Sequence, residues 1–404
     1  MTKTITVRRT LQMTALAGVL LTTACTDGWD LDLRGKVGGF DTSAAARGAT
    51  VASRPAADDR GVISYSDYYP FGMLMPNRHG QDDEYRYGFN GMESDDEIRE
   101  AIEKDILYIN VESEAELERV ELIAKELDTA ARISIRVNPN IDPKTHPYIS
   151  TGLHDNKFGV DLNSAKRMYI KANNSQYLDP VGIHFHIGSQ LTELQPIREA
   201  AEIVADLIRS LAAIDIELKF FDVGGGLGVK YKDEVTIEPY DYAQAILGTL
   251  TALDMTILCE PGRFLTANAG YFVTKFLYEK QNGDKKFVVI DGAMNDLLRP
   301  ALYNAYHAIE AITDSKQQSR KVDIVGPVCE SGDFFAKDYL LPPLNHNDLL
   351  VVKSAGAYGF GMGSNYNTRG RSAEVAIENS QARLIRRRES FEDLISLETE
   401  FLED

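Results

Sequence analysis

Two periodicities of apolar and polar positions alternate along the chain from about residue 95 to residue 267. Stretches with an apolar residue every three or four positions predict helices, and short runs rich in β-branched residues predict strands. Alternation of the two indicates parallel βαβ units. Helices are expected at 97–103, 113–127, 197–213 and 240–253, with another beginning near Asn163, and strands at 106–109, 133–137, 182–186, 220–223 and 255–259.

These strands number five, whereas a closed (β/α)8 barrel needs eight. The pattern therefore predicts an α/β fold, an incomplete (β/α)8 TIM-type barrel whose first strands are missing. Beyond Ala267 the chain becomes β-rich, with turn signals at Asn282-Gly283-Asp284 and Gly332-Asp333. A separate C-terminal β domain is expected there.

The first 25 residues combine a basic start, an apolar run from Ala15 to Leu21 and small residues directly before Cys25. This segment resembles a bacterial lipoprotein signal, which implies export and a lipid anchor at Cys25. The apolar run is too short to span a bilayer. An unstructured leader is the alternative.

Glycine, alanine, aspartate and arginine dominate from Thr26 to Arg60 without a sustained apolar period, which is typical of a linker. Aromatic residues and glycines follow at 65–73 and 85–91, a pattern typical of short strands and turns. Residues 62–91 resemble an Rhs/YD-repeat fragment, and a single repeat unit cannot bury its own face, so we expect poor order. The predicted domains are a signal (1–25), a linker with the Rhs-like fragment (26–88), a partial barrel (89–266) and a β-rich domain (267–404).

Composition limits the classes of function. The chain has 404 residues, 44% hydrophobic and 26% charged, enough for a large barrel and a second domain. Its net charge of -18 argues against binding to nucleic acid or to an anionic membrane, and favours a small-molecule ligand. Only three cysteines occur, Cys25, Cys259 and Cys329, too few and too scattered for a disulfide framework or a zinc cluster. No metal is predicted.

Three motifs follow predicted strands and so are expected at the C-terminal rim, where barrel enzymes keep their active sites. In His184-Phe-His-Ile-Gly-Ser-Gln190, the imidazole of His186 can lie flat on an aromatic ring and Ser189 can donate to a phosphate. A lone histidine on a strand would more often be a core residue.

The second motif is Phe221-Asp-Val-Gly-Gly-Gly-Leu-Gly228. Gly224, Gly225 and Gly226 allow backbone amides to cradle a phosphate, although a tight strand-to-helix turn explains them equally well. The spacing does not match a Gly-x-Gly-x-x-Gly dinucleotide site, so NAD is not expected. The third motif, Cys259-Glu-Pro-Gly-Arg263, sets an acid beside a turn and an arginine, and a salt bridge between Glu260 and Arg263 is its structural alternative.

The β-rich part adds further candidates. In Gly326-Pro-Val-Cys-Glu-Ser-Gly332, Cys329 can return a proton and Glu330 can pair with an ammonium group. Arg299, in Leu298-Arg-Pro-Ala-Leu-Tyr303, suits a carboxylate, and Ala357-Tyr-Gly-Phe360 supplies Tyr358. Cys329 could instead be an ordinary buried residue. Taken singly, Arg299 and Tyr358 are better explained as a surface arginine and a packed aromatic ring.

In this order and context, the motifs resemble those of fold-type III decarboxylases, which have the alanine-racemase-like fold. From about Phe89 to the C-terminus the chain is most similar to the diaminopimelate decarboxylase family. Three motifs favour that family over arginine and ornithine decarboxylases: His-Ile-Gly-Ser-Gln, Cys-Glu-Ser and Asn365-Tyr-Asn-x-Arg369. The resemblance implies pyridoxal 5'-phosphate, decarboxylation of meso-diaminopimelate to L-lysine, a cytoplasmic location, and a homodimer with shared active sites.

The resemblance also implies roles for single residues. Glu260 would face the pyridine nitrogen and keep it protonated, and Cys329 would be the catalytic acid, serving the neighbouring subunit together with Glu330. The implied cofactor-binding residues are His186, Ser189, Gly224, Gly225, Gly226, Glu260, Gly262, Arg263 and Tyr358, and the implied substrate-binding residues are Arg263, Arg299, Tyr303, Glu330 and Tyr358.

The chain departs from the family at one point. The cofactor should form a Schiff base with a lysine in a Tyr-Ala-x-Lys-Ala-type motif on an early strand, and before the resemblance begins the only lysines are Lys3 and Lys36. Lys171, in Tyr169-Ile-Lys-Ala-Asn173, imitates the motif but lies in a predicted helix. We therefore expect impaired turnover. Three alternatives stay open: a non-catalytic cofactor- or partner-binding protein, a chimera without selected function joined near 89–95, and one part of a split enzyme.

Overall fold

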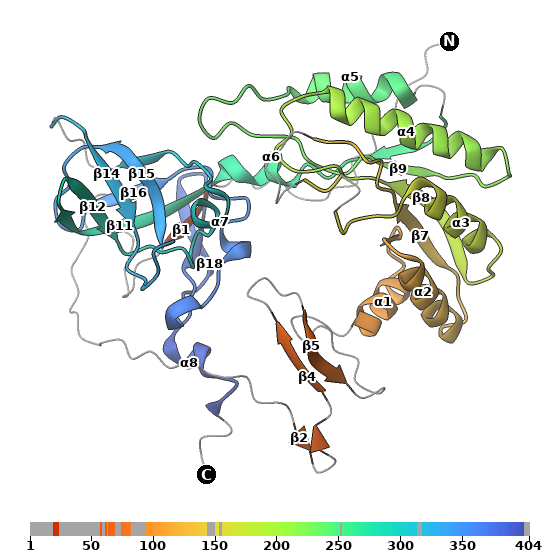
Figure 1. The fold of residues 1–404 in the computed structure, drawn as a ribbon, viewed down its shortest axis with the longest axis horizontal. Coiled ribbons are helices and arrows are strands. Elements are labelled where there is room, and N and C mark those ends of the chain that lie inside the picture. The colour runs from red at the N-terminus through yellow and green to blue at the C-terminus, as the bar shows by residue number, and fades with distance from the viewer. Residues whose placement is uncertain are drawn as a thin grey trace. The chain divides into compact units, whose positions relative to one another are not determined.

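The computed structural model describes residues 19–23, 57–58, 61–62, 64–68, 74–81, 94–143, 150–152, 156–250, 253–312 and 317–399. They belong to two compact units (Figure 1). Unit 1 comprises residues 1–48, 228–236 and 262–404, and unit 2 comprises residues 49–227 and 237–261.

Unit 2 is built on a parallel sheet of five strands in the order β10-β9-β8-β7-β6. This arrangement confirms the predicted five parallel strands linked by helices. The strands are β6 (Ile109–Val111), β7 (Ala131–Arg136), β8 (Leu178–His184), β9 (Phe220–Asp222) and β10 (Thr256–Leu258). The helices are α1 (Ser94–Glu103), α2 (Glu114–Glu126), α3 (Leu162–Asn173), α4 (Gln195–Ala212) and α5 (Pro239–Leu250).

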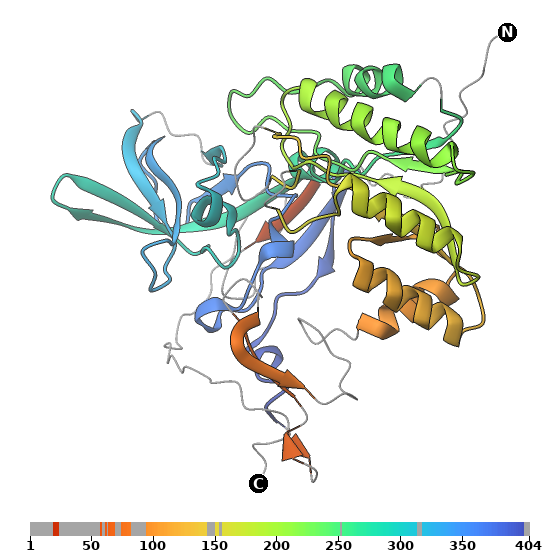
Figure 2. The same cartoon turned by 45° about the vertical axis from the view of Figure 1, so that its right-hand side comes forward.

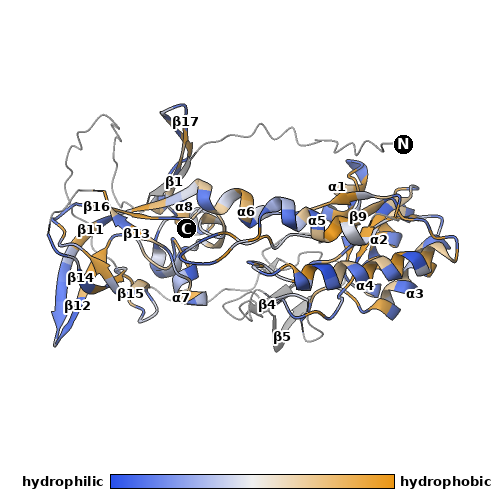
Figure 3. Ribbon diagram, turned by 90° about the horizontal axis from the view of Figure 1, so that it is seen from above, coloured by the Kyte–Doolittle hydropathy of each residue, from blue (hydrophilic) through white to orange (hydrophobic). Residues whose placement is uncertain are grey.

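The helices cover the sheet because each has one apolar stripe. Helices α2 and α3 contact β7 and β8, and α4 contacts both α3 and α5 (Figures 1 and 2). Hydrophilic and hydrophobic residues are interspersed along α4 (Figure 3), and its buried positions recur every three or four residues. Buried side chains of α4 include Ile197, Ala201, Val204, Ile208 and Leu211.

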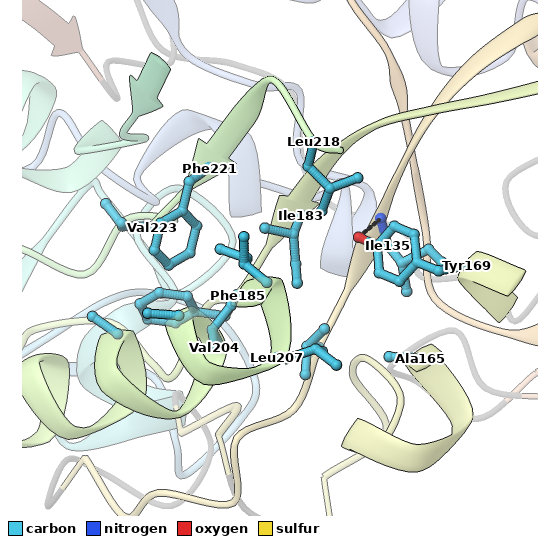
Figure 4. Packing of buried hydrophobic residues seen from close by; sticks show 14 of the residues in the cluster. Ile135, Ala165, Tyr169, Ile183, Phe185, Val204, Leu207, Leu218, Phe221 and Val223 are labelled. Atoms are coloured by element: carbon cyan, nitrogen blue, oxygen red, sulfur yellow. Dashed lines mark hydrogen bonds between the residues drawn. The ribbon is translucent and has the colours of Figure 1, made fainter. Parts of the chain in front are cut away.

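Tyr169 of α3 ties its helix to the sheet. Its side chain is fully buried, and its hydroxyl donates to the carbonyl of Gly182 at 2.6 Å. The same hydroxyl accepts from the amide of Ile135 at 3.4 Å, an interaction drawn in Figure 4. One phenol therefore serves backbone groups of both β7 and β8 within an otherwise apolar core.

The predicted beginning of α2 is confirmed. Ser113 is the N-cap and accepts from the amide of Glu116 at 3.1 Å, while the carboxylate of Glu116 reaches back to the amide of Glu112 at 2.6 Å. The strand expected at 106–109 was placed too early, since β6 begins at Ile109. Asp105 has a left-handed φ of 52°, and Arg132 donates to the carbonyls of both Asp105 and Ile106, so this segment is a loop.

The outer strand β10 differs from the central strands in burial. Thr256 and Ile257 are exposed, whereas β8 is buried at every position except one. A closed barrel would cover such an edge with its next strand. Within the described residues, the five-stranded sheet of unit 2 therefore has the open edges expected of a partial barrel.

Unit 1 is rich in β-structure, which confirms the prediction for the chain beyond Ala267. Its nine-stranded sheet has the order β15-β14-β12-β11-β1-β17-β18, and β16 pairs with both β11 and β13. The strands are β1 (Val19–Thr23), β11 (Gly270–Asn282), β12 (Lys285–Ile290), β13 (Ile309–Ala311), β14 (Arg320–Val325), β15 (Phe334–Leu341), β16 (Leu349–Val352), β17 (Ala373–Glu378) and β18 (Gln381–Arg386). Short helices are α6 (Gly262–Thr266), η3 (Ala267–Ala269), α7 (Arg299–Tyr303), η4 (Phe360–Met362), η5 (Tyr366–Thr368) and α8 (Phe391–Leu394).

The predicted turn signals lie where strands meet. Asn282 pairs with Lys285 across a two-residue turn in which Gly283 has a φ of 56°, a conformation that favours glycine. Asp333 directly precedes β15. Local residue chemistry therefore fixed these turns.

Part of the apolar run near the N-terminus pairs as a strand. β1 lies between β11, to which it is parallel, and β17, to which it is antiparallel. Cys25 and the remainder of the predicted lipoprotein signal lie outside the described residues, so the signal stays a prediction. Among the described residues, no helix is both long and apolar enough to cross a membrane.

Two small antiparallel strand pairs lie between residues 57 and 81, and the second of them falls within the segment with the Rhs-like pattern. β2 (Ala57–Asp58) pairs with β3 (Gly61–Val62), and β4 (Ser64–Tyr68) pairs with β5 (Leu74–Gln81). Residues 65–68 of the first aromatic cluster therefore belong to a strand, as expected, while residues 69–73 lie outside the described residues. The second cluster, at 85–91, lies outside the described residues, and the Rhs resemblance stays a prediction.

Replacing Tyr169 tests the link between α3 and the sheet. Tyr169→Phe keeps the ring but leaves the buried carbonyl of Gly182 without its donor, so we expect the free energy of unfolding to fall by roughly 1–3 kcal/mol. Urea unfolding followed by circular dichroism measures the change. Tyr240→Phe, at an exposed position of α5, is the control and should change the value by less than about 0.5 kcal/mol.

Candidate active site

Polar side chains gather at the carboxyl ends of three neighbouring strands of unit 2. His184 is the last residue of β8, Asp222 is the last residue of β9, and Glu260 follows β10 by two positions. One ligand atom from each of these three residues lies within 4.8 Å of the other two. The carboxyl edge of a parallel sheet is where ligands bind in such folds.

Close backbone contact explains the run of glycines at this edge. A Cβ on Gly225 would lie 2.2 Å from the carbonyl oxygen of Glu260, and one on Gly224 would lie 2.4 Å from that of Phe185. Gly224 and Gly226 also have φ values of 66° and 110°. The glycines are thus required by the approach of the loops after β8, β9 and β10.

The amides of this loop are partly engaged within the protein. Gly224 donates to the carboxylate of Asp222 at 2.9 Å, and Gly225 donates to Nδ1 of His186 at 3.1 Å. Because Nδ1 accepts, the proton of a neutral His186 is on Nε2. Burial, followed by the charge of Arg136, lowers the pKa of His186 to about 4. The ring is therefore neutral and fixed in orientation at neutral pH.

The two carboxyl groups have opposite electrostatic environments. His184 lies 3.5 Å from the carboxylate of Glu260 and lowers the pKa of that exposed group below its ordinary value. Burial raises the pKa of Asp222. The carboxylate oxygen of Asp222 that does not bind Gly224 accepts from the hydroxyl of Tyr108 at 3.1 Å. Glu260 is thus the group held ionised at this edge.

The remaining predicted cofactor residues fall in both units. Ser189 is half-buried in the loop after β8, in unit 2. Gly262 begins α6 in unit 1, and a Cβ there would meet open space, so the structure supplies no steric reason for this glycine.

Unit 1 brings two predicted arginines into one buried cluster. Arg263 donates to the hydroxyl of Tyr231 at 2.7 Å, and the guanidinium of Arg299 lies over the ring of the same Tyr231, 4.5 Å from its centre. Both arginine side chains are more than 90% buried. Arg299 also contacts Nε2 of His307 at 2.9 Å.

The partners of these arginines fix the state of His307. Arginine only donates, so Nε2 of His307 accepts and its Nδ1 donates to the carbonyl of Lys353 at 2.8 Å. Burial, followed by the charge of Arg299, lowers the pKa of His307 to about 4. Burial also lowers the pKa of Arg299. Sequence analysis did not identify Tyr231 or His307, because neither belongs to a recognisable motif.

Tyr358 joins the same cluster. The guanidinium of Arg263 lies 4.7 Å from the centre of its ring. Its backbone has a φ of 56°, a conformation that is strained for a bulky residue and is often retained at functional sites. Tyr303, the last residue of α7, is half-buried near Arg299 and interacts with its charge.

Cys329 and Glu330 lie in the loop between β14 and β15. Both are exposed, and Glu330 accepts from the amide of Gly332 at 3.0 Å. The contacts described for the arginine cluster are with Tyr231, His307 and Tyr358.

The chain is similar to a known family of proteins. The family model described as "Pyridoxal-dependent decarboxylase, pyridoxal binding domain" matches residues 87–267. The diaminopimelate decarboxylase of Campylobacter jejuni is 59% identical over 79% of this chain and 79% of its own length. A diaminopimelate decarboxylase of Helicobacter pylori is 54% identical over the same shares of the two chains.

Solved structures agree. The crystal structure of diaminopimelate decarboxylase from Helicobacter pylori complexed with L-lysine has a TM-score of 0.74 and 53% identity, covering 76% of this chain and 77% of that one. The chain belongs to the diaminopimelate decarboxylase family. It is therefore grouped with the carboxy-lyases that use pyridoxal 5'-phosphate.

The residues of unit 2 fit this cofactor of the diaminopimelate decarboxylase family. His186 presents a neutral ring of fixed orientation, Glu260 is an ionised carboxylate, and the glycine loop lets backbone approach both. Pyridoxal 5'-phosphate needs a ring to stack on, an anion beside its pyridinium nitrogen and a backbone that can approach its phosphate.

Two other sequence features have structural explanations. Arg369, the last residue of the Asn-Tyr-Asn-x-Arg motif, donates to Asn295 at 3.0 Å and to the carbonyl of Asp291 at 2.6 Å. Lys171 lies on the surface of α3 and pairs with Glu118 at 2.6 Å. The helical position predicted for Lys171 is thus confirmed.

The buried histidine of unit 1 predicts a dependence of stability on pH. The folded-state pKa of about 4 lies below the ordinary 6.5, so protons bind preferentially to the unfolded chain and stability falls as the pH drops from about 6.5 to about 4. For His307 alone, the loss between pH 7.5 and pH 5 is about 2 kcal/mol.

His307→Gln can still accept from Arg299 but does not titrate, so its unfolding free energy should fall about 2 kcal/mol less over this range. Denaturant unfolding at the two pH values measures the difference, and the contribution of His186 cancels. An exposed control, His346→Gln, should behave like the unchanged protein. Equal pH dependence in all three proteins would contradict the assignment.

Proposed function

We propose that this chain binds pyridoxal phosphate and a diamino dicarboxylic acid, meso-diaminopimelate, in the manner of a decarboxylase, with strongly impaired turnover. The observation that carries the proposal is the convergence of His186, the Gly224–Gly226 loop and Glu260 at the carboxyl edge of three adjacent strands. Family membership gives this convergence its chemical meaning.

Each group of unit 2 would have one task. The neutral ring of His186 would stack on the cofactor ring, and ionised Glu260 would hold a proton on its pyridine nitrogen. Ser189 and the amide of Gly226 would meet the phosphate, because the amides of Gly224 and Gly225 already have acceptors. Bound pyridoxal phosphate supplies an electron sink for the pair of electrons left when CO2 departs.

The arginine cluster of unit 1 suits a carboxylate of the substrate. Two guanidiniums are held in a buried site with an imidazole and phenols as neighbours, and Nε of Arg299 is buried without a hydrogen-bond partner. Burying positive charge is costly, so an incoming carboxylate would find preoriented donors. Tyr358 and Tyr303 would border this site. Gly262 would adjoin it, because it directly precedes Arg263 in the sequence.

Cys329 and Glu330 would act on a neighbouring subunit. Both are exposed, as expected of residues offered to another chain, and the proposal therefore includes a homodimer with shared sites. Cys329 would return a proton to the substrate, and Glu330 would pair with its distal ammonium.

Impairment is proposed because the lysine of the family is not recognised in this sequence. Lys171 is ion-paired on α3, while Lys3 and Lys36 lie outside the described residues. Transfer of substrate onto the cofactor would then lack its usual nucleophile, lowering turnover by orders of magnitude.

A non-catalytic binding role is the second candidate. The exposed side of β10, with Ile257 at its centre, favours it, because an unpaired strand edge can accept another chain. Four further possibilities rest on sequence alone. They are a chimera without selected function, a cytoplasmic location, a lipid anchor at Cys25 and the Rhs-like origin of 62–91.

Reduction with borohydride tests the missing lysine. We expect that pyridoxal phosphate incubated with the purified chain and then reduced leaves only scattered, substoichiometric label on lysines in peptide mass spectra. Lys171→Ala should give the same pattern as the unchanged chain. One stoichiometric label, whether at Lys171, Lys36 or the exposed Lys157, would show that an anchor exists and that impairment is wrongly assigned.

Equilibrium dialysis tests the cofactor site without requiring turnover. Removing the stacking ring in His186→Ala should weaken binding of pyridoxal phosphate by roughly two- to tenfold, the range expected for one aromatic contact. His346→Ala, in unit 1, is the matched control and should leave the affinity unchanged. Equal affinities of the two variants would remove His186 from the site.

A further inference from the structure

We infer that His184, Asp222 and Glu260 form a binding site for one divalent transition-metal ion. The sequence predicted no metal, because its three cysteines are too few and too scattered for a zinc cluster. In the described residues, these three side chains are the group that could hold an ion. They come from the ends of β8, β9 and β10, all within unit 2.

The geometry needs only a small adjustment. Nε2 of His184 is 3.5 Å from a carboxylate oxygen of Glu260, and all three ligand atoms lie within 4.8 Å of one another. Metal bonds to nitrogen and oxygen of about 2.0–2.2 Å require ligand atoms about 3–4 Å apart. Glu260 is exposed and can move closer, while buried His184 and Asp222 are already fixed.

The buried and unsatisfied ring of His184 is a second, independent indication of a ligand. Its side chain is about 4% exposed, and neither ring nitrogen makes a hydrogen bond. Buried polar atoms are nearly always satisfied, and leaving one without a partner costs about 1–3 kcal/mol. A metal ion on Nε2 would satisfy the nitrogen that already points toward Glu260.

Asp222 is held by its own contacts. One oxygen accepts from the amide of Gly224 and the other from the hydroxyl of Tyr108. Such secondary hydrogen bonds orient a metal-binding carboxylate.

One imidazole and two carboxylates suit zinc, cobalt or manganese rather than magnesium or calcium, which prefer oxygen ligands alone. The order of stabilities favours zinc and cobalt over manganese. Three protein ligands leave a coordination position for water. The net charge of -18 further favours an approaching cation.

The site has a consequence for the cofactor, and this step rests on the proposed function. Glu260 is also the carboxylate assigned to the pyridine nitrogen. One carboxylate cannot serve both a metal ion and a pyridinium in the same orientation, so the ion and pyridoxal phosphate should exclude each other.

Cobalt titration of the purified full chain, without cofactor, tests the site through the visible absorption of bound Co²⁺. We expect one equivalent to bind and Zn²⁺ to displace it. Glu260→Gln, which is exposed and nearly isosteric, and Asp222→Asn should each weaken binding at least about tenfold. His184→Gln should do the same, with circular dichroism confirming that each variant is folded.

Cys259→Ala is the matched control, because this thiol adjoins Glu260 but is not in the ligand group, and it should bind cobalt like the unchanged chain. Absence of a stoichiometric site would overturn the inference, as would affinities unchanged by Glu260→Gln and Asp222→Asn. Adding pyridoxal phosphate then tests exclusion. Loss of cobalt supports both assignments, whereas retained cobalt leaves the metal site standing and removes Glu260 from the cofactor role.

Discussion

Close packing of three loops against one another determines the geometry at the carboxyl edge of unit 2. A side chain on Gly224, Gly225 or Gly226 would overlap a backbone oxygen of the loop after β8 or β10. Because these loops cannot separate without losing that fit, the backbone positions of His186 and Glu260 are fixed beside the glycines. The glycines therefore have a structural cause that exists before any phosphate binds, and the same backbone approach makes the edge suitable for a cofactor.

Unit 1 depends on a different constraint, the burial of positive charge. Arg263 and Arg299 contact an aromatic ring, a phenol and a neutral imidazole. These partners accept hydrogen bonds and stabilise cations by their π-faces, but they carry no negative charge. Nε of Arg299 is buried without a hydrogen-bond partner, so a carboxylate could accept from it. This donor and the resemblance to decarboxylases are the two grounds for proposing a carboxylate ligand.

Ionisation at the edge of unit 2 permits two kinds of ligand. The imidazole of His184 keeps Glu260 charged, while burial disfavours the charge on Asp222. That arrangement would stabilise either a protonated pyridine nitrogen or a divalent cation. His186 offers a ring to stack on for the first ligand, and His184 offers a nitrogen ligand for the second.

Sequence by itself determined the features that depend on neighbours along the chain. Local propensity and spacing encode the five alternating strands, the beginning of α2 at Ser113, the turn at Gly283 and the motifs that indicate the family, so all of these could be predicted. The start of β6 was misread, since Arg132 binds the carbonyls that precede it. Tyr231 and His307 were not found, and His184 was not joined to Asp222 and Glu260. Only tertiary structure decided these, because the residues are distant along the chain and meet only when parallel strands end at a common edge or when buried cations find aromatic partners.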